Sequence, residues 1–182
     1  SAARNWSSPS TKGNTMLLEA IFGLQLIFSI VVVSVIARVY IAPWLSGISH
    51  HAALAILVLP HTIRHIGMSF QVPGLVGDAL PSDFAAAAAY GDLASAVFAL
   101  LAFLLLRSGA SVAIGFAWIF NLIGFIDLVN ALRQAEAIPQ LGVTWFIPTF
   151  IVPVLLVTHV MIFARLIQGA PTAQPGSTAQ TG

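Results

Sequence analysis

The chain has 182 residues, of which 58% are hydrophobic and only 7% are charged. Soluble domains carry about 25% charged residues and depend on them for a water-compatible surface. The net charge of +1 argues against a nucleic-acid partner, and the lack of cysteine excludes disulfides, thiolate metal sites and thiol catalysis. The composition therefore predicts a protein whose main partner is the lipid bilayer.

The chain starts with a polar, serine-rich leader, Ser1–Thr15, and its first methionine is Met16. Because an apolar run begins at that methionine, we predict that the leader is disordered or non-native and that it lies outside the fold. A secretory signal is the alternative. The run Ile21–Ala37 is too long for a typical signal core and has no clear cleavage site of small residues.

Five runs are long and apolar enough to cross a bilayer as helices, which takes about 20 residues each. They cover residues 16–41, 51–70, 83–106, 110–132 and 145–167. Pro43 and Pro73 predict the ends of the first two runs. The sequence thus predicts one domain, 16–168, with an all-α fold: an integral membrane bundle of five transmembrane helices with short loops. A disordered tail, 169–182, follows.

The arginines predict the orientation of this bundle. Those expected at one end are Arg38, Arg107 and Arg165. Charged residues near the other end are Arg133, Asp78, Asp83 and Glu136. Counted without Arg4 and Lys12 of the leader, this pattern predicts an outer N-terminus and a cytoplasmic C-terminus, as in a multi-pass protein of the bacterial inner membrane.

Small residues and prolines predict how the helices pack. The third run has a stripe formed by Ala85, Ala88, Ala89, Asp92, Ser95, Ala96 and Ala99. Small residues let helix backbones approach closely, so we expect this helix in the centre of the bundle. Pro60, Pro148 and Pro153 lie inside the second and fifth runs and should kink them.

Ionisable side chains inside a bilayer cost about 2.5–3.5 kcal/mol each on insertion scales and are usually paired. Arg64 is permanently charged, and Asp92 and Asp127 are the only deep carboxylates, so we predict that Arg64 pairs with one of them. This pair would lock helices together or bind a small polar ligand from the outer side. The full candidate cluster is Arg64, Asp92, Asp127, Tyr90, Asn121 and Asn130.

The histidines give a second set of candidate sites. His61 and His65 are four residues apart, which places them on one face of an α-helix, and such a pair can bind a divalent metal ion with His159 or Asp92 as a further ligand. Arg64 beside them would repel that ion. His61 and His159 are also predicted at similar depth, as the two axial ligands of haem b would be. Interhelical hydrogen bonds are the simplest interpretation of each ring. The same polar residues make the second run the least certain span, and a re-entrant helix there would leave four.

No phosphate-binding glycine loop, Gly-x-Ser-x-Gly or His-Glu-x-x-His motif is present, so nothing predicts an enzyme. The only lysine, Lys12, is in the leader, which excludes a retinal Schiff base in a span. We therefore expect a non-enzymatic membrane protein: a subunit of a complex or homo-oligomer, or a small-ligand-binding bundle. The alternatives are a haem or metal protein that uses His61, His65 and His159, and a proton-coupled transporter.

Four segments carry a resemblance: Leu59–Gly67, Ala89–Leu93, Phe120–Asn130 and Trp145–Pro153. They resemble stretches of small uncharacterised bacterial inner-membrane proteins that cross the membrane several times. The resemblance extends over Met16–Leu166. It implies a membrane location and no particular chemistry.

Overall fold

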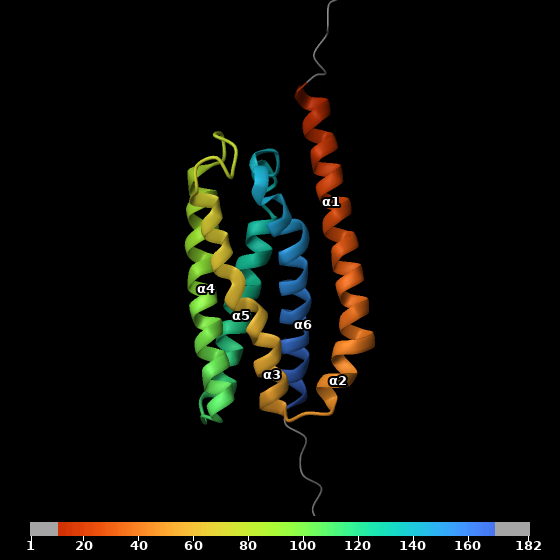
Figure 1. Cartoon of the computed structure of the whole chain (residues 1–182), viewed down its shortest axis with the longest axis vertical. Helices are drawn as coiled ribbons and strands as arrows, with labels where there is room; N and C mark the ends of the chain where they lie inside the picture. The colour runs from red at the N-terminus through yellow and green to blue at the C-terminus, as the bar shows by residue number, and fades with distance from the viewer. Residues whose placement is uncertain (1–10, 170–182) are drawn as a thin grey trace, which may run out of the picture.

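The computed structural model describes residues 11–169, and every long element in this range is a helix (Figure 1). Five helices there are long and apolar enough to cross a membrane: Gly13–Ser46, His50–Gln71, Ser82–Ser108, Ala113–Leu132 and Gly142–Gln168. The predicted all-helical bundle with five such helices is confirmed. Most of the predicted leader and tail lies outside the described residues, but helix α1 already begins at Thr11, upstream of Met16.

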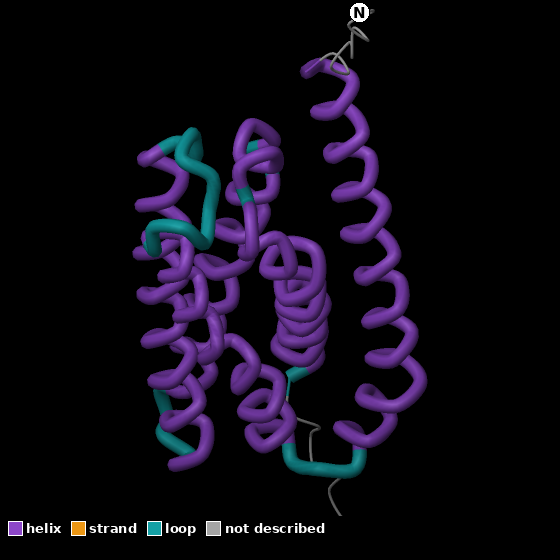
Figure 2. The backbone as a smooth tube through the Cα atoms, turned by 45° about the horizontal axis from the view of Figure 1, so that its top comes forward, coloured by secondary structure: helices purple, strands orange, loops and turns teal. Residues whose placement is uncertain are grey.

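The first long helix does not end at its proline. Helix α1 (Thr11–Ile36) continues through a π-helical turn, Ala37–Ile41, into the short helix α2 (Ala42–Ser46), which has Pro43 in its first turn. The π-helical turn directly ahead of Pro43 already interrupts the α-helical hydrogen-bond ladder, so the proline without its N–H fits there. Helix α1 lies at one edge of the fold, beside α6 (Figures 1 and 2).

The second long helix changes its pitch halfway. Helix α3 (His50–Val58) begins at Ser49, whose hydroxyl accepts a hydrogen bond from the N–H of Ala52 at 3.3 Å. From Leu59 to Gln71 the chain forms the 3-10 helix η2, which has Pro60 in its first turn. With about three residues per turn, side chains three positions apart align. The aligned, buried face of η2 consists of His61, Arg64, Gly67 and Phe70.

Helix α4 (Ser82–Ser108) packs along η2 and α3 through the small residues predicted to allow close approach. Its buried alanines are Ala85, Ala89, Ala96, Ala99 and Ala102. The predicted central position is wrong, because α4 lies at the edge of the fold away from α1 (Figure 1). Its other face is apolar and exposed, as at Leu100 and Leu104. Gly109, at φ +68°, ends α4 before α5 (Ala113–Leu132) begins.

The last long helix is assembled from several short pieces. Two 3-10 helices, η3 (Ala135–Gln140) and η4 (Gly142–Trp145), lead into a π-helical turn, Ile147–Ile151, and then into α6 (Val152–Gln168). Pro148 lies in the π turn, where the missing N–H interrupts the α-helical ladder as predicted. Backbone hydrogen bonds tie this connection to the 72–81 loop: Gly77 N donates to Gln140 O at 2.8 Å, and Val143 N donates to Leu75 O at 2.9 Å.

A small apolar cluster of Leu128, Val152 and Leu155 joins α5 to α6, and two larger clusters fill the rest of the bundle. One joins α3, the second half of α4 and the ends of α5 and α6 that lie near it, and includes Leu54, Ala99 and Ile162. The other lies near the 72–81 loop and η3, and includes Phe70 and Phe84. The buried polar residues of η2, α5 and α6 fall between these clusters along each helix, so apolar packing shields them at both ends.

Candidate functional site

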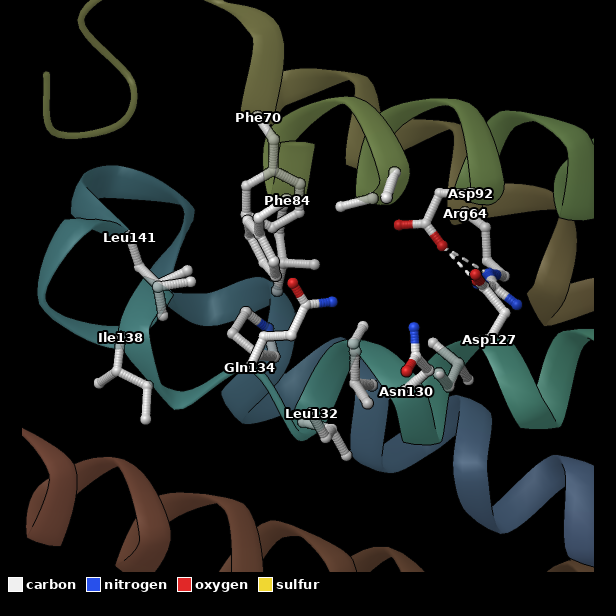
Figure 3. Close-up of a pocket in the computed structure, with 18 of the residues that line it drawn as sticks. Arg64, Phe70, Phe84, Asp92, Asp127, Asn130, Leu132, Gln134, Ile138 and Leu141 are labelled. Carbon is white, nitrogen blue, oxygen red and sulfur yellow. Dashed lines mark hydrogen bonds and ion pairs between the residues drawn. The ribbon is translucent and has the colours of Figure 1, made fainter. Parts of the chain in front are cut away.

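Arg64 is the largest fully buried side chain among the described residues, at 1% exposure. Its Nε donates to Asp92 Oδ1 at 2.7 Å, and its Nη2 lies 2.5 Å from Asp127 Oδ2. Its Nη1 donates to the carbonyl of Gly124 at 3.2 Å. One guanidinium therefore joins η2, α4 and α5 (Figure 3). The ion pair expected with one carboxylate is present with both.

This cluster holds two carboxylates for one guanidinium, so it carries a net charge of −1 when both are ionised. The side chains of Asp92 and Asp127 are 14% and 36% exposed, whereas that of Arg64 is closed off. The excess negative charge therefore lies on the accessible side of the cluster. One oxygen of Asp92 turns away from Arg64, toward the open space in Figure 3.

Three polar side chains, Asp92, Asp127 and His159, each pack against a glycine of a neighbouring helix. A Cβ at Gly67 would collide with the carboxylate of Asp92. A Cβ at Gly91 would come within 2.9 Å of Asp127 Oδ1. At Gly124 it would lie 2.9 Å from the His159 ring and 3.2 Å from Nη1 of Arg64. These three glycines were not predicted from the sequence, although each lies within three residues of a candidate polar residue.

His61 and His159 are both 0% exposed, and their ring centres are 4.1 Å apart. Thr158 directs its hydroxyl hydrogen to carbonyls of the preceding turn, so its oxygen accepts from Nε2 of His61 at 3.0 Å. Asn121 donates its amide to the carbonyl of His159, and its Oδ1 accepts from His159 Nδ1 at 2.7 Å. The other nitrogens, His61 Nδ1 and His159 Nε2, have no hydrogen-bond partner within residues 11–169.

The structure separates His65 from the other histidines. Its ring is exposed, and its Nδ1 lies 2.9 Å from the carbonyl of Thr62. The predicted common face of His61 and His65 is wrong, because η2 turns every three residues and places position i+4 to one side. Tyr90 is 63% exposed and is not part of the cluster, and Asn121 contacts His159 rather than Arg64.

The residues do not fit the metal or haem sites considered above. In the described part of the chain, no group of three or more His, Cys, Asp or Glu side chains could hold a metal ion. A haem between two imidazoles needs ring centres roughly 6 Å apart, because two metal–nitrogen bonds of about 2 Å each separate the ligating nitrogens and each ring centre lies about 1 Å behind its nitrogen. At 4.1 Å, the rings of His61 and His159 leave no space for one.

A cavity of about 70 Å³ lies on the accessible side of the arginine cluster, beside η3. Asp92, Asn130 and Gln134 direct polar groups toward it, and Phe70 and Phe84 form an aromatic wall (Figure 3). One water molecule needs about 10–15 Å³ of such volume, so several waters or a small organic group fit. Asp92 and Asn130 were predicted from the sequence as site residues, whereas Gln134 and the two phenylalanines were not.

Fold and site together define a bundle of long apolar helices with a buried arginine–dicarboxylate cluster beneath a small cavity. The chain belongs to a family described as a domain of unknown function, DUF8737, whose model matches residues 21–167. That match contains every residue of the cluster and the cavity. No curated protein and no solved structure matches the chain.

Proposed function

We propose that this is a multi-pass membrane protein of the bacterial inner membrane that binds a small amine in the cavity beside Arg64, Asp92 and Asp127. Its apolar exterior supports the membrane location. Residues of α1 such as Leu24, Ile27 and Phe28 are more than 60% exposed, and lipid would shield them from water.

The charges at the two ends support the orientation proposed here. Arg38, Arg107 and Arg165 lie at the end where α4 and α6 finish, and no acidic residue of the described chain lies there. The opposite end has Glu19, Asp78, Asp83 and Glu136 with Arg133. Because arginine accumulates on the cytoplasmic side of membrane proteins, the C-terminus is cytoplasmic and the cavity faces the outer half.

The class of ligand is inferred from the charge beside the cavity, where two carboxylates face one guanidinium. Arg64 neutralises one of the two carboxylates, and the cavity borders the remaining negative charge. A protonated amine would supply the missing positive charge and donate hydrogen bonds to the carboxylate of Asp92. The faces of Phe70 and Phe84 would add cation–π attraction, and the small volume limits the ligand to a short aliphatic body.

The test compares probes of equal shape and different charge. Calorimetric titration of the detergent-purified chain with butylammonium, butanol and butyrate should show binding in that order of strength. Asp92→Asn should abolish the preference for butylammonium, whereas Asp83→Asn, an exposed carboxylate on the same helix that does not line the cavity, should keep it. Equal binding of the amine and the alcohol, or equal loss in both variants, would refute the proposal.

A further inference from the structure

A second, larger space lies between the first long helix and α6. This groove has a volume of about 500 Å³, within the range of known ligand pockets. Ten residues line it: Ile30, Ser34, Ala37, Arg38, Ala42, Leu156, Val157, Val160, Met161 and Ala164. Nine of them are uncharged and eight of these are apolar, so the groove suits a hydrocarbon chain.

The only charge in the groove lies at one end. Arg38 is exposed and belongs to the π-helical turn Ala37–Ile41, a distortion that often accompanies functional sites. In the described chain, Arg38 has no carboxylate partner. Arg165, near the end of α6, donates to the carbonyl of Ala42, which lines the groove, at 3.5 Å. The groove thus has its one guanidinium at the arginine end of the bundle, where Arg38, Arg107 and Arg165 lie, and no acidic side chain of the described chain lies at that end.

We propose that this groove is a binding site for an anionic phospholipid of the leaflet at the arginine end. The acyl chain lies along the apolar wall between α1 and α6, and the phosphate pairs with Arg38. From Ala42 back to Ile30 the helix rises about 18 Å, which places the chain inside the leaflet and the headgroup at its surface. This inference rests on the membrane location proposed above, but not on the amine site.

Native mass spectrometry of the detergent-purified chain tests the proposal, with phosphatidylglycerol and phosphatidylcholine as probes. Phosphatidylglycerol should bind in preference. Arg38→Gln should weaken that binding about fivefold, since one basic residue near an anionic surface contributes about 1 kcal/mol. The matched control is Arg107→Gln, because Arg107 lies at the same end but outside the groove. Equal losses in both variants would mean unspecific surface attraction and would overturn the proposal.

A second pair of variants tests the groove itself. Ala164→Trp fills it and should reduce binding of both lipids, while Ala94→Trp, at an exposed position of α4 outside the groove, should leave binding unchanged. Unchanged binding in Ala164→Trp would overturn the proposal. So would a dimer of the wild type that Ala164→Trp converts to a monomer, because a second copy would then occupy the groove. Failure of the wild type to float with liposomes would instead refute the membrane location.

Discussion

Removing the guanidinium of Arg64 should be far more damaging than neutralising the whole cluster. Arg64→Met keeps most of the side-chain length but leaves Asp92 and Asp127 facing each other without a cation. The triple variant Arg64→Met, Asp92→Asn, Asp127→Asn removes the charges together. If the cluster is stabilised by mutual charge compensation, the triple variant should be the more stable of the two.

The structure sets the expected magnitudes. Breaking a buried ion pair by removing one partner costs about 3–5 kcal/mol. Asp92 is 14% exposed and carries most of this penalty, whereas Asp127 is 36% exposed and is partly screened by solvent. We therefore expect a loss of about 3 kcal/mol in the free energy of unfolding for Arg64→Met. The triple variant should recover at least half of that loss, because a neutral replacement of a buried charge set is often tolerated.

The assay is unfolding in a mild detergent by titration with sodium dodecyl sulfate, followed by circular dichroism, with wild type and both variants measured side by side. Equal instability of the single and triple variants would show that Arg64 stabilises the bundle by packing or by its bond to the Gly124 carbonyl, and the charge argument would fail. A single variant within about 1 kcal/mol of wild type would refute the expected penalty as well.

Three further substitutions have defined outcomes in the same assay. Gly67→Ala brings a methyl group against the carboxylate of Asp92 and should cost about 1–3 kcal/mol, whereas Gly23→Ala, which meets no atom within 4 Å, should cost nothing. Asn121→Leu leaves a buried imidazole N–H unpaired, so a loss of about 1–3 kcal/mol is expected, and unchanged stability would contradict the assigned hydrogen bond. Gly109→Ala places a Cβ at φ +68° and should cost about 1–2 kcal/mol, with no change in any ligand or lipid binding.

The sequence predicts well those features that depend only on the length of the apolar runs or on the small number of charged residues inside them. Five long apolar runs can only be long apolar helices, whatever their neighbours. Arg64 can only pair with Asp92 or Asp127, because the interior offers no other carboxylate. Neither inference requires knowledge of helix pitch or packing, and both features are present in the structure.

The errors come from local backbone geometry. The common face of His61 and His65 assumed 3.6 residues per turn, but the segment after Pro60 has three. The buried set at positions 61, 64, 67 and 70 repeats with that period, so the signal was present in the spacing of polar and aromatic residues. Gln134 was not predicted for a different reason. It lies in the connection between α5 and η3, and only the folding of η3 over the bundle turns it toward Asp92.

The 3-10 helix also has a mechanical consequence. It rises about 2.0 Å per residue, against 1.5 Å for an α-helix, so the 13 residues of η2 extend over about 26 Å instead of about 20 Å. Together with α3, they match the length of the 27-residue helix α4 with five residues fewer. The segment is therefore held stretched, and a return to α-helical pitch would shorten it by about 6 Å. Since the 72–81 loop continues directly from its end, that contraction would break the backbone hydrogen bonds that tie Gly77 to Gln140 and Leu75 to Val143.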